Sequence, residues 1–378
     1  MRIGILTQPL FTNYGGILQA YALQRVLHEL GHEAVVVRFA RQHLFGRRHG
    51  RLRRVGETFW NAGRLLLGRI PLDTLLSRRT EKFVRTHITP RTAPLTSTAG
   101  LVRACRKNHF EAYVVGSDQV WRPEYSPCLP HFFLDFAEGQ SVRRIAYAAS
   151  FGVDHWPLSP SETDRCGALL RRFDAISVRE ESAVALCRDH FAVDATQVLD
   201  PTLLLDAADY ARLADEAHEP ASAGQLFDCR LDPSPASDRI LRTLAAATGL
   251  RPFATRPVRT LTKENIRRHP ADCTFPPVTA WIRSFQDAEL VLTDSFHGCV
   301  FAILFHKPFI VLGHEGRGMT RFHSLLNLFG LSDRLTDAKD TDKSVTLACR
   351  PIDWARVEAV RQAARGRSLH FIAQATRA

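Results

Sequence analysis

The chain has 378 residues, a mass of 42.5 kDa and a formal net charge of +11. This length exceeds the size at which a single hydrophobic core usually keeps growing, so we expect two α/β domains. Hydrophobic residues make up 45% of the chain and charged residues 24%, which excludes a disordered, collagen-like or coiled-coil protein. The excess of positive charge favours an anionic partner.

Cysteine usage and hydropathy indicate the compartment. The eight cysteines are scattered and none belongs to a CxxC pair, which favours buried reduced thiols over a zinc site or a disulfide framework. The first residues, MRIGILTQPL, lack the basic and long apolar regions of a signal peptide. The longest apolar stretches, such as 299–305, are far shorter than the roughly 20 residues that span a bilayer. We expect a cytoplasmic protein.

The N-terminal residues predict a βαβ unit. RIGILT (2–7) is typical of a buried strand, and after the TNYGG loop apolar residues recur at helical spacing. Gly31 stands where a left-handed residue ends a helix, and AVVVRF (34–39) supplies the second strand. Such a unit implies a parallel sheet whose ligands collect beyond the carboxyl ends of its strands.

A basic segment follows, and we expect it to form a helical insertion over about 41–90. Between Arg41 and Arg79 there are ten arginines against two acidic residues. The segment is either an amphipathic surface that rests on anionic lipid head groups at the inner membrane face, or a solvated helical hairpin. We expect no nucleic-acid partner, because no recognisable reading motif accompanies the charge.

The rest of the chain alternates between short strands and helices. We expect strands at 112–117, 144–150, 173–178, 289–293 and 308–313, and helices at 180–190, about 237–248, 278–286, from 297 and at 353–375. The stretch 207–222 is typical of a crossing between lobes. We therefore predict an N-terminal Rossmann-like domain over 1–205, a C-terminal one over 206–350, and a final helix, 351–378, that packs back.

The TNYGG loop is the first candidate site. Asn13, Tyr14, Gly15 and Gly16 lie between a strand and a helix, where free backbone N–H groups and the helix N-terminus favour a bound anion. The alternative is that the glycines only permit a tight turn and close packing.

The GSDQVW motif is the second candidate, because it follows a strand that we expect to be central. Ser117 and Asp118 can contact the substrate, Asp118 can bond to or deprotonate a sugar hydroxyl, and Trp121 can offer its ring face to a pyranose. In the alternative interpretation Asp118 caps the next helix and Trp121 is buried.

Arg179 is the third candidate, again at the carboxyl end of a predicted strand. A guanidinium at that place can hold a carboxylate or phosphate with two parallel hydrogen bonds. Alternatively, Arg179 forms a surface ion pair with Glu180 that contributes little.

The TDSFHG motif is the strongest candidate. It joins a predicted strand to an apolar helix and places His297 at the helix start, where the imidazole can give or take a proton near neutrality. Asp294 and Ser295 are candidate substrate contacts, and Asp294 is close enough in sequence to orient the ring. Gly298 permits close approach. Alternatively, His297 is a structural residue bonded to a carbonyl.

A glycine-rich loop after the strand at 308–313 carries Arg317, with Arg321 close behind. Both arginines can add positive charge for an anion. A flexible loop with solvated charges is the alternative.

Taken together, these motifs resemble the polysaccharide pyruvyl transferase family. The resemblance rests on TNYGGILQAYALQ, VVGSDQVW, AYAASFG, ISVREES, VLDPT and LTDSFHG followed by KPFIVLG, in this order over about residues 1–335. It implies a GT-B-like fold, α/β with two Rossmann-like domains whose parallel sheets face a central cleft. It also implies phosphoenolpyruvate as donor, a cell-surface or lipid-linked glycan as acceptor, and no cofactor or obligatory metal ion.

The resemblance also assigns roles. His297 would be the general acid for the enol, and Asp118 would activate the acceptor hydroxyl. Arg179 would hold the donor, and a second cation would help it. The candidates for that cation are Arg317, Arg321 and Lys307. The family pattern Arg-Leu-His-Gly departs here to Ser295-Phe296-His297-Gly298. A donor-binding cation is therefore missing at position 295. Either another arginine binds the donor in its place, or the donor is a different molecule.

Two other functions remain open on the sequence. The same fold could serve a glycosyltransferase that uses a nucleotide sugar. The arginine-rich segment could instead belong to a non-catalytic scaffold for polysaccharide assembly at the membrane surface.

Overall fold

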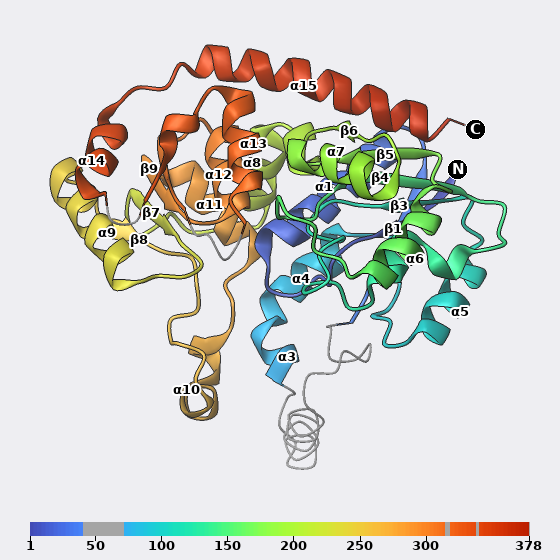
Figure 1. The fold of residues 1–378 in the computed structure, drawn as a ribbon. Coiled ribbons are helices and arrows are strands. Elements are labelled where there is room, and N and C mark those ends of the chain that lie inside the picture. Colours follow the sequence, from blue (N-terminus) through green and yellow to red (C-terminus); the bar gives the residue numbers. More distant parts are fainter. Residues whose placement is uncertain (41–71, 314–317, 338–339, 378) are drawn as a thin grey trace.

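The protein consists of two lobes, each built around one all-parallel sheet (Figure 1). The computed structural model describes residues 1–40, 72–313, 318–337 and 340–377. The strand order is β2-β1-β3-β4-β5-β6 in the first lobe and β11-β10-β9-β7-β8 in the second. These two sheets confirm the predicted α/β fold with two Rossmann-like halves.

The strands are short and mostly buried, as parallel strands between helices must be. Those of the first sheet are β1 (Arg2–Leu6), β2 (Glu33–Val37), β3 (Ala112–Val115), β4 (Arg143–Ala149), β5 (Ala175–Val178) and β6 (Thr196–Gln197). Those of the second are β7 (Leu226–Cys229), β8 (Pro252–Phe253), β9 (Leu290–Thr293), β10 (Phe309–Leu312) and β11 (Leu335–Thr336). The boundary expected near residue 205 falls between the two sets.

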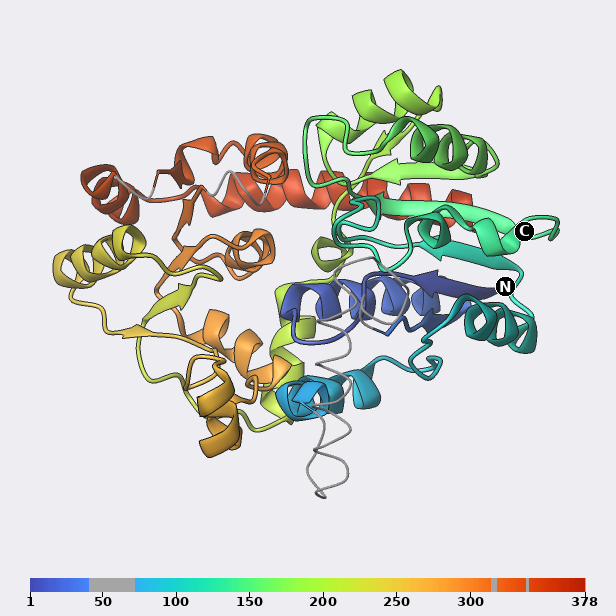
Figure 2. The same cartoon turned by 60° about the horizontal axis from the view of Figure 1, so that its bottom comes forward.

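Helices cover both sheets (Figure 2). Up to the end of the first sheet they are α1 (Tyr14–Glu29), α3 (Leu72–Leu76), α4 (Arg78–His87), α5 (Thr98–Asn108), α6 (Pro160–Leu170) and α7 (Glu181–Leu186). After a 3-10 helix, η5 (Pro201–Leu204), come α8 (Ala207–Glu216), α9 (Pro235–Thr248), α10 (Lys263–Arg268), α11 (Val278–Asp287), α12 (Phe296–Leu304), α13 (Thr320–Phe329), α14 (Thr341–Cys349) and α15 (Trp354–Ala375). Among the described helices, none is both long and apolar enough to cross a membrane.

The first βαβ unit forms as its sequence predicts. The Asn13 side chain caps α1 by accepting from the Gly16 N–H at 3.1 Å. Gly31 ends the helix at a φ of +83°, a left-handed conformation that glycine adopts without steric cost. One hydrophobic cluster then continues from α1 through Leu203 of η5 to Phe301 of α12, so the two lobes share a core.

Helix α15 joins the two lobes, and in Figure 1 it runs along the top of both. At its start Arg356 donates to the Gly330 carbonyl of the second lobe at 3.1 Å. At its end the Ala375 carbonyl accepts from Arg143 of β4 at 3.1 Å. The C-terminal helix thus packs across the junction between the sheets.

Several elements differ from the prediction. The stretch 207–222, expected to be a crossing between the lobes, starts with α8, because Asp206 and Asp209 form a capping box and Tyr210 packs into the core. The helical stretch expected at 180–190 is present, but only α7 is α-helical and a π-helical turn, Cys187–Phe191, continues it. Of the expected basic insertion, 41–71 lies outside the described residues, whereas α3 and α4 confirm helix in the remainder.

Candidate functional site

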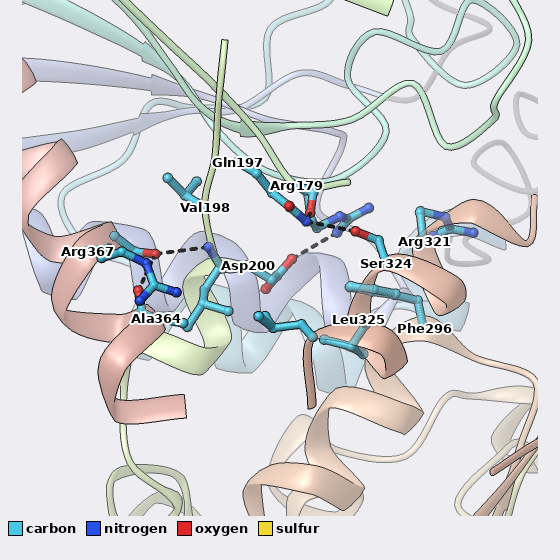
Figure 3. Close-up of a pocket in the computed structure, with 13 residues that line it drawn as sticks. Arg179, Gln197, Val198, Asp200, Phe296, Arg321, Ser324, Leu325, Ala364 and Arg367 are labelled. Atoms are coloured by element: carbon cyan, nitrogen blue, oxygen red, sulfur yellow. Dashed lines mark hydrogen bonds and ion pairs between the residues drawn. The ribbon is translucent and has the colours of Figure 1, made fainter. Parts of the chain in front are cut away.

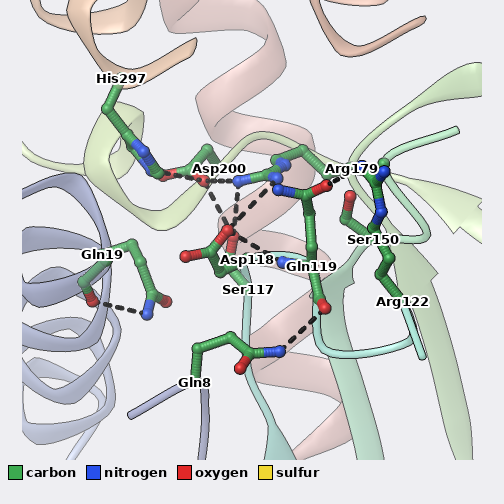
Figure 4. Close-up of polar contacts among 12 residues, drawn as sticks. Gln8, Gln19, Ser117, Asp118, Gln119, Arg122, Ser150, Arg179, Asp200 and His297 are labelled. Carbon is green, nitrogen blue, oxygen red and sulfur yellow. Dashed lines mark hydrogen bonds and ion pairs between the residues drawn. The ribbon is translucent and has the colours of Figure 1, made fainter. Parts of the chain in front are cut away.

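The candidate site lies where the carboxyl ends of β3 and β5 meet the N-terminus of α12 (Figure 4). The first lobe contributes Asp118, Arg179 and Asp200, and the second contributes His297. Parallel sheets present their loops at this edge, so residues far apart in the sequence converge there.

Arg179 is the central cation of the site. Its side chain is only 3% exposed, and its Nη1 donates to Asp200 Oδ2 at 2.8 Å. The Nη2 atom lies 3.9 Å from Asp118 Oδ1, and Nε lies 3.9 Å from Glu180 Oε2. Burial opposes the charged form, but the three carboxylates outweigh it and raise the pKa of Arg179.

One edge of the Arg179 guanidinium is open to further hydrogen bonds, although it faces Asp118 and Glu180 at 3.9 Å. Within the part of the chain that the structure describes, Nε and Nη2 are buried without a hydrogen-bond partner. These two atoms form a fork that matches a carboxylate or phosphate. Buried donors are rarely left unsatisfied, so the open edge is a candidate position for an anion.

Asp200 links the two lobes electrostatically. Its Oδ2 atom accepts from Ser117 Oγ and from Arg179, each at 2.8 Å, and lies 3.6 Å from His297 Nε2. Burial would raise the pKa of Asp200, but the neighbouring His297 and Arg179 hold it well below its usual range. The carboxylate is therefore a permanent buried anion.

His297 is buried at the junction of the lobes. Ser295 caps α12 by accepting from the Gly298 N–H at 3.3 Å, which places the imidazole in the first turn. The residue is 6% exposed, and its Nε2 has no hydrogen-bond partner among the described residues. A methyl group on Gly15 would collide with the ring, so the imidazole packs directly on the backbone of α1.

The TNYGG loop has a different role from the expected anion cradle. The Asn13 side-chain oxygen accepts from the Gly16 N–H, and its Nδ2 donates to Asp118 Oδ2 at 3.4 Å. Tyr14 stacks on Trp281 at 5.6 Å between ring centroids and donates to the Pro276 carbonyl at 3.1 Å. The loop therefore caps α1 and connects the lobes, and its glycines permit the close packing of His297.

Asp118 adopts a strained backbone conformation, with φ at +76°. It is 6% exposed and accepts from the Gln119 N–H at 2.9 Å. No helix begins directly after it in the described chain, so it is not the helix cap of the alternative interpretation. A buried non-glycine residue with positive φ costs free energy, and such residues gather at functional sites. The conformation directs Asp118 toward Arg179.

Trp121 and Ser117 require corrections. Trp121 is fully buried, stacks on Phe133 and donates its indole N–H to the Phe132 carbonyl at 3.1 Å. It offers no ring face to a sugar, because the GSDQVW segment folds back into the core of the first lobe. Ser117 is also fully buried, and its hydroxyl supports Asp200 instead of facing a ligand.

Asp294 is not the partner of His297. Its carboxylate accepts from the backbone N–H groups of Leu231 at 2.6 Å and Asp232 at 3.0 Å, and so holds the loop after β7. The carboxylate next to the imidazole is Asp200 of the VLDPT motif, which follows β6. The two residues of β6 carry no periodicity, so no predicted strand end marked Asp200 as a site residue.

A cavity of about 80 Å³ lies beside Arg179 (Figure 3). Arg179 and Arg321 flank Phe296, with their guanidinium carbons 4.3 and 5.6 Å from the ring centroid. Burial and the nearby Arg179 lower the pKa of Arg321 to about 10. Asp200 also lines this cavity but His297 does not, so the imidazole lies on the other side of the carboxylate.

Of the two further candidate cations, the structure describes only Lys307, and it lies away from the site. Lys307 precedes β10, at the opposite edge of the second sheet, and donates to the Gln286 carbonyl at 2.8 Å. It is therefore not a donor-binding residue. Arg317 lies outside the described residues. Within the described ranges, no group of three His, Cys, Asp or Glu side chains is arranged to hold a metal ion.

The arrangement combines a group that can transfer a proton with two arginines that can bind an anion. His297 can move a proton, Arg179 and Arg321 can bind negative charge, and Asp118 is an acceptor for a hydroxyl proton. Because the groups come from both lobes, the site exists only when the lobes meet.

Comparison with solved structures identifies the fold as GT-B. The chain superposes on the UDP-GlcNAc 2-epimerase of Neisseria meningitidis with a TM-score of 0.54 at 11% identity, covering 99% of each chain. A glycosyltransferase from Rickettsia africae gives 0.52 at 7% identity, covering 99% of this chain and 96% of that one. The UDP-GlcNAc 2-epimerase of Methanocaldococcus jannaschii gives 0.51 at 12% identity, covering 93% of each chain.

A comparison with curated proteins finds no significant match. The family model of the polysaccharide pyruvyl transferases, however, matches residues 13–316. This range begins at the cap of α1 and includes Asp118, Arg179, Asp200 and His297. The chain therefore belongs to the polysaccharide pyruvyl transferase family.

Proposed function

We propose that this transferase moves the pyruvyl group of phosphoenolpyruvate onto two hydroxyls of one sugar in a cell-surface polysaccharide or its precursor. The observation that carries the proposal is the convergence of His297, Asp200 and the open edge of Arg179 between the lobes. A buried acid beside a guanidinium fork suits an anionic enol ester.

The chemistry requires one acid and one or more cations. His297 gives a proton to the methylene carbon of the donor, which becomes a methyl group and leaves a cationic carbon. One sugar hydroxyl attacks that carbon and loses its proton to Asp118. Phosphate then leaves, and the second hydroxyl attacks to close the ketal. The products are the ketal and inorganic phosphate. Of the two hydroxyl protons, one replaces the proton given to the methylene carbon and the other is taken up by the released phosphate.

Arg321 is the cation that takes the place of the arginine missing at Ser295. Both Arg179 and Arg321 contact the face of Phe296 and line the same cavity. Two buried guanidinium groups so close repel each other, and an anion between them relieves that repulsion. We assign the donor carboxylate or phosphate to this pair.

The proposal extends to the acceptor and the place of action. We assign a glycan or lipid-linked sugar as acceptor, a cytoplasmic location, and peripheral contact with anionic lipid through the segment from Arg41 to Arg79. The described end of that segment belongs to α3 and α4, where Arg78 and Arg79 are exposed. Sedimentation with vesicles that contain phosphatidylglycerol, compared with phosphatidylcholine alone, tests the contact.

The experiment for the activity measures phosphate release from phosphoenolpyruvate with a panel of bacterial glycans, and detects the ketal methyl group by proton NMR. We expect release with at least one acceptor, and a loss of about 10²-fold or more in His297→Gln because a general acid contributes at least that factor. Calorimetric titration should show donor binding that Arg179→Met abolishes. Absence of both binding and release, with stabilisation by a nucleotide sugar instead, would overturn the proposal.

A further inference from the structure

We propose that the segment 254–275 of the second lobe inserts Val258 and Leu261 into the surface of an anionic lipid bilayer. This segment, the basic arm, connects β8 to α11 and contains α10. The proposed function assigns lipid contact only to the segment from Arg41 to Arg79. The inference adds a contact from the other lobe, and it does not depend on the reaction that the site carries out.

The basic arm is packed against the first lobe. Two of its side chains, Ile266 and Cys273, are buried in a small hydrophobic cluster with Leu75 and Leu76 of α3. The Phe275 N–H donates to the Leu76 carbonyl at 3.0 Å. Helices α10 and α3 therefore lie side by side, and both project from the body of the molecule (Figure 1). The apolar side chains of the arm that can be buried within the protein are thus already used.

Other apolar side chains of the basic arm face solvent. Val258 is 85% exposed, more than any other large apolar side chain in the described ranges, and Leu261 is 43% exposed. Single exposed apolar residues are common on protein surfaces. Here two lie within four residues of each other, on a segment that projects. Such side chains gain free energy when the acyl boundary of a bilayer removes them from water.

The charge of the basic arm suits an anionic surface. Between positions 256 and 272 there are five cations and two acidic residues, an excess of three positive charges. Both acidic residues pair with an arginine of the arm, at 2.9 and 3.2 Å. Lys263 and Arg267 are exposed on α10. Apolar side chains flanked by lysine and arginine are typical of segments that lie in the interface of an anionic membrane.

The cations of the basic arm continue onto the first lobe. Next to α3, the start of α4 exposes Arg78, Arg79 and Lys82. The arm also leaves the second sheet after β8, at the carboxyl edge from which α12 and His297 start. Under the proposed function, a lipid-linked acceptor would therefore approach the junction of the lobes from this surface.

The first experiment measures binding of the full chain to vesicles of phosphatidylglycerol and phosphatidylcholine. Replacing both Val258→Ser and Leu261→Ser should weaken binding about tenfold or more, because burying one aliphatic side chain accounts for a factor of that size. Replacing both Lys263→Gln and Arg267→Gln should weaken it by a similar factor, with a smaller effect at high salt.

Two control variants match these changes elsewhere on the surface. Leu30→Ser removes an apolar side chain that is 36% exposed at the end of α1. Arg239→Gln with Arg242→Gln removes two exposed arginines from α9 of the same lobe. Both variants should bind vesicles as the natural chain does.

The second experiment detects insertion itself. Bromine atoms on the acyl chains quench a tryptophan only when its ring enters the bilayer. Val258→Trp should therefore be quenched more strongly by vesicles of brominated phosphatidylglycerol than Leu30→Trp. The five natural tryptophans are the same in both proteins and give an equal background.

Three results would overturn the inference. The first is a natural chain that does not bind anionic vesicles, and the second is equal quenching of Val258→Trp and Leu30→Trp. The third is a loss of vesicle binding on charge removal alone, with the Val258 and Leu261 pair variant unaffected, since that pattern indicates an electrostatic surface for an acidic macromolecule.

The proposed function is tested separately from the basic arm. Phosphate release with a water-soluble acceptor should be unchanged in the Val258 and Leu261 pair variant, because neither residue belongs to the site. If no acceptor is turned over by any protein, the proposed function fails while the vesicle and quenching measurements still decide the inference.

Discussion

At the scale of single residues, the site depends on a contact between a glycine and a histidine from different lobes. Gly15 lies in the first turn of α1, and the imidazole of His297 packs on it where any side chain would stand. A glycine here is required by close approach, since its φ is not positive. The two lobes are thereby brought near enough for Asp200 to reach the ring.

We predict that Gly15→Ala displaces the imidazole and lowers phosphate release about 10²-fold, because a shift of about 1 Å in a reacting group can cost that much. Donor binding to Arg179 should change far less, as titration calorimetry will show. Gly366→Ala is the control, since an added methyl there meets open space on α15. Its activity should stay unchanged; equal losses in both variants would contradict the role given to Gly15.

At the scale of elements, α15 is the helix that holds the junction together. Arg361 is 5% exposed and donates to Glu358 at 2.7 Å as well as to the carbonyls after Asp200. The bond from Arg361 is the main reason that the pKa of Glu358 is lowered to about 2. The helix therefore carries an ionised carboxylate that supports the arginine clamping the site.

This lowered pKa predicts an acid dependence of stability. A carboxylate whose folded pKa lies below its ordinary value of 4.5 stabilises the fold above that value, and the contribution is lost as the pH falls from about 4.5 to about 2. In Glu358→Gln, the decline of the unfolding free energy over this window should be shallower, as measured by urea unfolding. Glu264→Gln, which removes an exposed pair with Arg268, should leave the decline unchanged. Identical slopes in the natural chain and Glu358→Gln would refute the prediction.

At the scale of the whole molecule, the two lobes cover His297, which under the proposed function must contact the donor. His297 is 6% exposed and lines no part of the described cavity next to Arg179. Tyr14 holds the seam by stacking on Trp281 and donating to the Pro276 carbonyl. Under the proposed function, substrate entry therefore requires the lobes to separate, and catalysis requires them to return.

We predict that Tyr14→Ala opens the seam and speeds the reaction of His297 with diethyl pyrocarbonate, followed by mass spectrometry of the modified peptide. Tyr14→Phe keeps the stack and loses only the hydrogen bond to Pro276, so its rate should lie close to that of the natural chain. Phosphoenolpyruvate should protect His297 in all three proteins. If the three rates agree, Tyr14 does not hold the lobes together.

Much of the architecture could be predicted from local pattern. The alternation of short apolar runs with helical spacing predicted the parallel sheets, and Gly31 marked the end of α1. Arg179 and His297 each follow a strand, so the site edge was predictable as well. The strands β6, β7, β8 and β11 were missed. Three of them have only two residues, and the four residues of β7 are also too few to show a periodicity.

The chemical groups of the site and the sheet edge where they stand follow from the amino-acid sequence, since both depend on neighbours a few residues away. Which of these groups meet follows from the packing of the lobes. It paired His297 with Asp200 instead of Asp294, buried Trp121, and left Lys307 at the far edge. These choices depend on how two lobes pack, and packing joins residues whose separation along the chain leaves no local signal.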